Sequence, residues 1–360
     1  MKMARNFTPK TKKERDIKME RKKIVFTAPL KAELQTEQIG ELQAGMVLVK
    51  TLYSTVSSGT ERANLIGKET VSPNRHEDGI ATYPRCLGYS TAGIVEAVGE
   101  GVTRVKVGDR VASIWTIHTN YNIVPEKNLT VIDESISLSE AAIWPIASFP
   151  LAAIRKTRLE MGETALVMGL GVLGLTAIQL LRAAGASVIV AVDPIPEKRE
   201  LALKIGADYA FDPFAEDFEA NVRRASYGGI NVAIEVTGNC RALDMVLDCM
   251  QYFGRVALLG CTRTSDFNID YYKKVHAPGI TLVGAHTMAR PQVDSSNGWW
   301  TERADMQAIY RLVKSGRLSF AQLIEETHSP KEAPEVYTRL ANEKAFPMVQ
   351  FDWSLCEEGN

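Results

Sequence analysis

The chain of 360 residues is 45% hydrophobic and 24% charged, the composition of an ordinary soluble globular protein long enough for two domains. Its formal net charge of −1 gives no overall field that would attract nucleic acid or an anionic membrane, so neither is expected as a partner. The five cysteines form no C-x-x-C pair, which argues against a cysteine-rich zinc site and favours a reducing, cytoplasmic compartment.

The N-terminal residues 1–22 predict a disordered basic tail. Residues 1–23 contain ten Lys or Arg and three Asp or Glu, and they lack the apolar stretch of a secretory signal. A nucleic-acid-binding arm is the alternative, although aromatic residues are nearly absent from this segment.

Residues 24–145 predict an all-β unit. The runs MVLVKTLYSTV, TAGIVEAVG and DRVASIWTI are short and rich in Val, Ile and Thr, and turn signals such as VGEGV and VGDRV separate them.

The stretch VSSGTERANLIG, residues 56–67, gathers polar side chains in front of an apolar run. Hydroxyl side chains such as Ser58 and Thr60 compete for backbone hydrogen bonds, so they are disfavoured inside a helix. The segment, which also contains Glu61, is therefore either a surface turn or a polar site.

The middle of the chain predicts a dinucleotide-binding unit. A buried apolar strand at 165–169 is followed by a G-x-G-x-x-G turn, an apolar helix and a second buried strand. In such a unit Gly169 permits the tight turn, Gly171 lets the backbone approach a pyrophosphate, and Gly174 lets the helix pack on the strand. Val172 and Leu173 belong to the same turn, where the start of the helix presents free N–H groups to the phosphates.

The acidic residue after the second strand bears on the choice of cofactor. Asp193 lies 19 residues after Gly174, where a carboxylate accepts hydrogen bonds from the adenosine ribose and repels a 2′-phosphate. NAD is therefore expected rather than NADP. Lys198 either reaches the same ribose edge or is a solvated helix charge.

Further strands and helices alternate as far as residue 286, which indicates a doubly wound parallel sheet and an α/β fold class. Ligands of such sheets lie beyond the carboxyl ends of the strands. Thr237 and Gly260 follow two strands in this way, so we expect both to contact the cofactor.

The C-terminal part predicts an amphipathic helix in TERADMQAIYRLVKSG, a helix opened by SPKE and a final strand in AFPMVQFDW. Before them, Trp299 and Trp300 lie in a loop rich in Gly, Ser and Asn. Their rings either stack on a sugar ring of the substrate or form a subunit contact.

The motifs VSSGTE, LGYSTAGIVEAVGEGV, VGDRV and MGLGVLG together resemble the medium-chain dehydrogenase/reductase superfamily of the zinc alcohol dehydrogenase type. The resemblance implies a GroES-like β-rich catalytic domain over residues 23–150, completed by residues 288–360. It implies a Rossmann domain over residues 151–287 and an active site in the cleft between the domains. Dimers and tetramers are common among such proteins, so a homodimer or homotetramer is expected.

The chain departs from the zinc-binding members at each ligand position. Ser58 stands where they have cysteine, Tyr89 where they have histidine, and Trp144 where a third ligand often falls. Because these residues are not zinc ligands at neutral pH, no metal is expected. Ser-x-Gly-Thr-Glu with Gly-Tyr resembles a zinc-free branch that includes bacteriochlorophyllide a dehydrogenase, and the tail resembles guloside 3-dehydrogenase-like proteins.

Without a metal, a hydrogen-bonding group must handle the proton of the alcohol. The resemblance gives Thr60 the position that touches the substrate oxygen. We expect Tyr89 to transfer the proton if a nearby cation lowers its pKa, with Thr60 as relay and Ser58 and Glu61 as supporting polar contacts. The alternatives are a packed aromatic role for Tyr89 and a pairing of Glu61 with Arg62 or another surface cation.

The expected function is an NAD-dependent, zinc-independent conversion of a secondary alcohol to a ketone, on a small-molecule sugar, glycoside or polyol. His118, in WTIHTNY, is an expected substrate contact because family members face the cleft there. The alternatives are a quinone or enone reductase that prefers NADPH, and a non-catalytic dinucleotide-binding protein.

Overall fold

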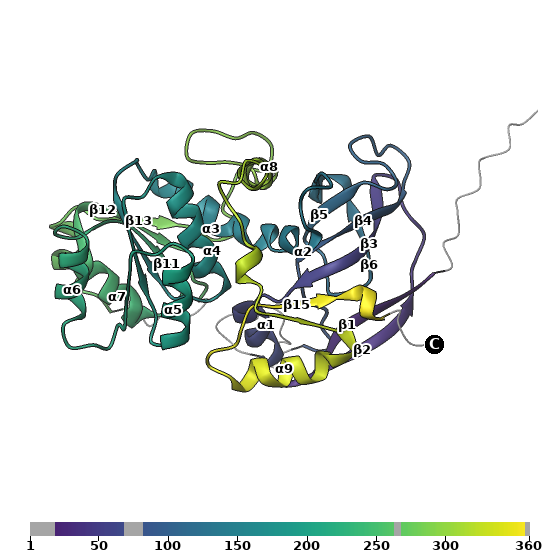
Figure 1. The fold of residues 1–360 in the computed structure, drawn as a ribbon, viewed down its shortest axis with the longest axis horizontal. Helices are drawn as coiled ribbons and strands as arrows, with labels where there is room; N and C mark the ends of the chain where they lie inside the picture. Colours follow the sequence, from purple (N-terminus) through teal and green to yellow (C-terminus); the bar gives the residue numbers. More distant parts are fainter. Residues whose placement is uncertain (1–18, 68–81, 263–267, 357–360) are drawn as a thin grey trace, which may run out of the picture.

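The computed structural model describes residues 19–67, 82–262 and 268–356, which form two lobes (Figure 1). The expected basic tail lies outside the described residues as far as residue 18, and the first strand, β1 (Glu20–Ala28), begins within the range expected for that tail. Within the described ranges, no helix is long and apolar enough to cross a membrane.

One lobe is built on a seven-stranded sheet in the order β14-β15-β3-β4-β5-β7, with β6 also paired to β3. Its strands are β3 (Met46–Thr55), β4 (Ser90–Val98), β5 (Arg110–Ile114), β6 (Tyr121–Pro125), β7 (Leu129–Val131), β14 (Glu326–His328) and β15 (Val349–Asp352). A separate antiparallel hairpin pairs β1 with β2 (Lys31–Gln38). Because β15 pairs with β3, the end of the chain completes this lobe.

The other lobe is built on a six-stranded parallel sheet in the order β10-β9-β8-β11-β12-β13. Its strands are β8 (Thr164–Met168), β9 (Val188–Val192), β10 (Tyr209–Phe211), β11 (Ile230–Glu235), β12 (Met250–Leu258) and β13 (Thr281–Gly284). In chain order this is 3-2-1-4-5-6, the arrangement of a dinucleotide-binding fold, whose ligand crosses the sheet between β8 and β11. The expected doubly wound sheet is confirmed.

Helices cover both faces of the parallel sheet, as its continuously apolar strands require. One face packs against α3 (Trp144–Thr157), α4 (Val172–Ala184) and α5 (Pro196–Lys204). The other face packs against α6 (Phe218–Ala225) and α7 (Cys240–Cys249). Side chains that alternate along β9 enter the two cores in turn, since successive residues of a strand point to opposite faces.

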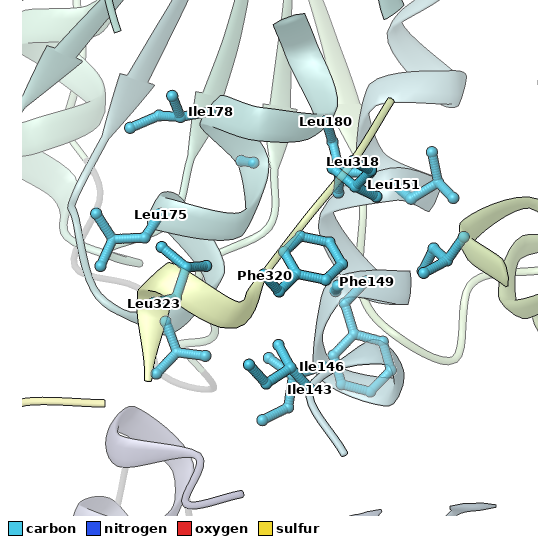
Figure 2. Close-up of a cluster of buried hydrophobic side chains, with 14 of the residues drawn as sticks. Ile143, Ile146, Phe149, Leu151, Leu175, Ile178, Leu180, Leu318, Phe320 and Leu323 are labelled. Atoms are coloured by element: carbon cyan, nitrogen blue, oxygen red, sulfur yellow. The ribbon is translucent and has the colours of Figure 1, made fainter. Parts of the chain in front are cut away.

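The helix α3 lies between the lobes and joins their cores, and the expected domain boundary at residue 150 falls within it. Figure 2 shows Phe320 and Leu323 of the returning chain between α3 and α4, beside Ile146 and Leu175. This apolar contact fixes the C-terminal segment against both lobes.

The remaining helices belong to the lobe of the seven-stranded sheet or connect to it. They are α1 (Ser58–Leu65), α2 (Leu138–Ala141), α8 (Glu302–Lys314) and α9 (Ala333–Asn342). The expected cap at Ser329 is present as a capping box, and it opens a short turn, Pro330–Glu332, directly before α9. Single-turn 3₁₀-helices lie at Glu126–Asn128, Ala321–Leu323 and Trp353–Cys356. A short π-helix lies at Tyr272–His276.

Candidate active site

The glycine turn after β8 has the shape of a pyrophosphate cradle. A Cβ at Gly174 would lie 1.9 Å from the Gly169 carbonyl oxygen, so α4 can approach β8 only with glycine there. A Cβ at Gly171 would meet nothing within 4 Å, because this glycine faces open space. Val172 and Leu173 begin α4 directly behind it, so the free N–H groups of the first turn meet this space. The turn therefore fits the phosphates of a dinucleotide.

The carboxylate at the end of β9 is fixed before any ligand binds. Asp193 accepts hydrogen bonds from the backbone N–H groups of Leu170, at 2.8 Å, and Ile195, at 2.9 Å. The remaining lone pairs can accept from a ribose hydroxyl. Lys198 is not a solvated helix charge, because it is buried and its ammonium lies 3.4 Å from Glu325 of the returning chain; its contact with the ribose edge stays a prediction.

The turn after β11 is held by a buried carboxylate that the sequence analysis did not single out. Glu235 accepts hydrogen bonds from the backbone N–H groups of Thr237, at 2.7 Å, and Gly238, at 3.0 Å. A Cβ at Gly260 would lie 2.0 Å from the Gly238 nitrogen, so the turns after β11 and β12 touch. Thr237 and Gly260 thus sit at adjoining strand ends, where the expected cofactor contact needs them.

In the lobe of the seven-stranded sheet, a tyrosine hydroxyl and a serine hydroxyl meet at the start of α1. The Ser57 Oγ lies 2.5 Å from the Tyr89 hydroxyl. Ser57 occupies the cap position before α1, yet its side chain makes no capping hydrogen bond. Thr60, in the first turn, is exposed, and its hydroxyl is close enough to lower the pKa of the same phenol. The structure therefore brings Tyr89 together with Thr60 and with Ser57, rather than with the expected Ser58.

The electrostatics around the phenol differ from the expectation. Burial raises the pKa of Tyr89 to about 12, the Glu61 carboxylate raises it too, and hydrogen bonds from Ser57 and Thr60 lower it. The expected role needed a cation that lowers this pKa, whereas the charge that acts on it is an anion. The phenol is consequently protonated at neutral pH and suited to donate a hydrogen bond.

Glu61 and His118 lie behind this site instead of lining it. Both are buried, with 0% and 1% of their surfaces exposed, and the His118 Nε2 lies 3.1 Å from each carboxylate oxygen of Glu61. His118 is thus not placed to contact a substrate, and Glu61 pairs with it rather than with Arg62, which donates to the Leu340 carbonyl. The sequence could not reveal this pair, because its members are 57 positions apart.

Two further aromatic rings stand beside Tyr89. Its ring centroid lies 5.5 Å from that of Phe149 and 6.1 Å from that of Trp115. The Trp115 indole N–H donates to Glu302 of α8 at 2.7 Å, and its backbone has a left-handed φ of 60°. Such conformations are uncommon for large side chains and concentrate at functional sites. With 41% of its surface exposed, Trp115 offers an apolar face next to the phenol.

The paired tryptophans are engaged within the chain. The Trp300 ring lies 3.6 Å from the Arg155 guanidinium carbon, and the Trp299 ring lies 5.2 Å from the Lys156 ammonium. Cations therefore stack on the two rings for which a sugar contact or a subunit contact is expected from the sequence.

The residues at the three zinc-ligand positions do not fit a zinc ion. Ser58 and Tyr89 supply hydroxyl oxygens, and Trp144 is fully buried in the apolar core. Over residues 19–67, 82–262 and 268–356, no group of three or more His, Cys, Asp or Glu side chains could hold a metal ion. The hydroxyl and indole groups at these positions are not the thiolate, imidazole and carboxylate ligands that zinc takes in proteins.

Comparison with known proteins identifies the family. Residues 43–134 match the model of the alcohol dehydrogenase GroES-like domain, and residues 172–297 match that of the zinc-binding dehydrogenase. The L-threonine 3-dehydrogenase of Pyrococcus abyssi is 30% identical over 341 residues, which covers 83% of this chain and 88% of that protein. The chain belongs to the medium-chain dehydrogenase/reductase superfamily.

Two further comparisons bear on enzyme class and fold. The D-guloside 3-dehydrogenase of Escherichia coli is 25% identical over 342 residues, covering 89% of this chain and 96% of that protein. A putative zinc-binding dehydrogenase from Sinorhizobium meliloti, solved with bound NADP, has a TM-score of 0.76 at 21% identity, covering 93% of this chain and 99% of that one. The expected pairing of GroES-like and Rossmann domains is confirmed, and the chain is a dehydrogenase of a family that typically depends on NAD(P).

Proposed function

We propose that this medium-chain dehydrogenase interconverts a secondary alcohol and a ketone on a sugar, glycoside or polyol, with NAD and without zinc. The observation that carries the proposal is the 2.5 Å contact between Ser57 and Tyr89, two hydroxyl groups in the region where zinc-binding relatives hold their metal. The names of the relatives, a guloside and a threonine dehydrogenase, support a small hydroxylated substrate.

The choice of NAD over NADP rests on charge at the ribose edge. Asp193 would meet a 2′-phosphate with like charge. The Arg199 guanidinium donates to the Asp193 backbone carbonyl at 2.7 Å and lies 3.6 Å from the Asp212 carboxylate, so it already has partners within the chain. These contacts favour a free ribose hydroxyl.

When bound, the nicotinamide ring supplies the site that accepts or gives the hydride, and the residues of this chain handle the proton. In reduction, the Tyr89 phenol donates its proton to the carbonyl oxygen while the carbon gains the hydride, and the Ser57 and Thr60 hydroxyls pass a replacement proton from solvent. In oxidation, the phenol oxygen takes the proton of the alcohol as its own proton moves to these hydroxyls. Because the proton is passed on in the same step, no free phenolate has to form, in keeping with a phenol pKa near 12.

Trp115 gives this reaction its substrate platform. Its exposed face stands beside the phenol and suits the C–H face of a sugar ring.

Substrate profiling of the purified protein tests the proposal. Sugars, glycosides, polyols, quinones and enones are offered with NAD(H) and with NADP(H), and bound metal is measured by elemental analysis. We expect turnover of a polyhydroxylated substrate with NAD that survives dialysis against a chelator. Turnover only of quinones or enones with NADPH would favour the reductase alternative, and one zinc per chain would contradict the metal-free mechanism.

We further propose that the enzyme is a homodimer or homotetramer in the cytoplasm. In the part of the chain that the structure describes, the five cysteines form no disulfide bond, in keeping with a reducing compartment: Cys86, Cys240, Cys249, Cys261 and Cys356. Light scattering after size-exclusion chromatography measures the oligomer, and a monomer would contradict the proposal.

A further inference from the structure

A buried carboxylate ties three distant segments of the chain to the start of α1. The Glu61 Oε1 accepts a hydrogen bond from the Ser57 backbone N–H at 2.7 Å. Its Oε2 accepts from the Tyr337 hydroxyl of α9 at 2.5 Å, across 276 positions of sequence. Burial raises the pKa of Tyr337 well above its usual value, so its hydroxyl remains a donor.

The second partner of the carboxylate is oriented by the end of the chain. The Trp353 indole can only donate, and it donates to the Ser54 Oγ at 2.9 Å. The Ser54 hydroxyl lies 2.8 Å from the His118 Nδ1, and the His118 Nε2 lies 3.1 Å from the Glu61 Oε1. The imidazole therefore bridges Ser54 and the Glu61 carboxylate. Although burial raises the pKa of Glu61, the His118, Tyr337 and Ser57 contacts bring it below its usual value.

This cluster of Glu61, His118, Ser54, Tyr337 and Trp353, here called the buried hub, contacts both sides of the Ser57–Tyr89 pair. On one side Glu61 holds the Ser57 backbone N–H. The Ser57 hydroxyl makes no capping hydrogen bond and lies against the Tyr89 hydroxyl instead. On the other side the backbone N–H of His118 donates to the Leu87 carbonyl at 2.8 Å. A Cβ at Gly88, next to Tyr89, would lie 2.8 Å from the same backbone nitrogen.

We propose that Glu61 is a positioning residue, held by Tyr337 and His118, through which the C-terminal segment sets the Ser57–Tyr89 geometry needed for proton transfer. The part that concerns catalysis rests on the function proposed above. The part that concerns geometry does not, because it predicts the state of the Tyr89 phenol whether or not a substrate is known.

A matched pair of tyrosine variants tests this inference. Tyr337→Phe removes only the hydroxyl that donates to Glu61 at the start of α1. Tyr83→Phe removes a hydroxyl that donates to the Asn64 and Leu65 carbonyls at the other end of the same helix, at 2.9 and 3.0 Å. Each variant loses one hydroxyl that donates a hydrogen bond to α1 from outside the helix. An effect that comes only from a weaker α1 should therefore appear in both variants.

The first measurement does not need activity. In protein labelled with ¹³C at the tyrosine ζ carbon, the Tyr89 resonance is the one missing from Tyr89→Phe. We expect Tyr337→Phe to shift this resonance at neutral pH and Tyr83→Phe to leave it in place. An unshifted Tyr89 resonance in folded Tyr337→Phe would overturn the inference, even if the wild-type protein turned over no substrate in the panel.

The second measurement is kinetic. We expect kcat to fall at least about tenfold in Tyr337→Phe, with the dinucleotide KM unchanged, while Tyr83→Phe keeps the wild-type kcat. Glu61→Gln removes the charge at similar volume and should lower kcat further if it folds. Equal losses in Tyr337→Phe and Tyr83→Phe would reduce Glu61 to a structural role and overturn the inference.

Discussion

The Tyr89 hydroxyl lies 2.5 Å from the Ser57 hydroxyl, although 32 positions separate the two residues in sequence. The contact joins the loop before β4 to the residue before α1, so it exists only when the two segments pack. It gives the phenol a neighbour that can give or take its proton, which is the chemistry we propose for the site.

Removing that phenol should stop most of the chemistry without weakening cofactor binding. We expect Tyr89→Phe to lower kcat by about a hundredfold or more, because general acid–base groups contribute about 10²–10⁴ in rate. Steady-state kinetics with the substrate found by profiling measures this, with NADH affinity by fluorescence as the control. Ser57→Ala should lose more activity than Ser58→Ala, and the reverse order would contradict the assignment of Ser57.

The pH profile of kcat should lack a phenol limb in the neutral range. Because burial raises the folded-state pKa of Tyr89 to about 12, the phenol stays protonated at all lower pH values. We therefore expect no loss of activity from phenol ionisation between about pH 7 and pH 10. A limb in this window that disappears in Tyr89→Phe would show that the phenol works as a base of lowered pKa.

Two alanine substitutions in the glycine turn should have opposite signatures. Gly174→Ala places a Cβ 1.9 Å from the Gly169 carbonyl oxygen, so we expect a clear drop in Tm. Gly171→Ala adds a methyl group in open space, so Tm should hold while NADH affinity falls. Thermal unfolding and fluorescence titration measure both, with Gly40→Ala, also in open space, as the control. Unchanged NADH affinity in Gly171→Ala would argue against pyrophosphate binding there.

Neutralising the carboxylate after β9 should change the choice of cofactor. In Asp193→Asn we expect NAD affinity to fall about tenfold, through the loss of a charged acceptor for the ribose hydroxyls. NADP affinity should rise relative to NAD, because the like charge is gone. Asp208→Asn, which alters a carboxylate paired with Arg182, serves as the control. An unchanged ratio of the two affinities would show that Asp193 does not read the ribose.

The three tryptophans can be separated by kinetics. We expect Trp115→Ala to raise the substrate KM about tenfold, since an aromatic contact contributes about 0.5–1.5 kcal/mol beyond its buried area. Trp299→Ala should lower Tm instead, because its ring stacks on Lys156 within the chain. If Trp299→Ala raises the substrate KM more than Trp115→Ala does, the ring that contacts the substrate is that of Trp299 and not that of Trp115.

The sequence predicted those features that local patterns encode. Strand and helix periodicity, the glycine turn and Asp193 all lie within one continuous segment, and the parallel sheet forms there as expected. The capping box at Ser329 is likewise a pattern of four neighbouring residues. The absence of zinc-type side chains at positions 58, 89 and 144 is chemistry that can be read without coordinates.

Tertiary structure decided which of the polar side chains face the site. Glu61 was expected as a supporting polar contact in the site, and packing of α9 and of the loop around His118 buries it completely. Ser57 rather than Ser58 meets Tyr89, because the chain before α1 places the Ser57 hydroxyl against the phenol and not on a capping N–H group. Trp115 stands beside the Tyr89 ring, whereas the rings of Trp299 and Trp300 meet the cations of α3. These outcomes depend on contacts between segments as far as 276 positions apart, which no local pattern specifies.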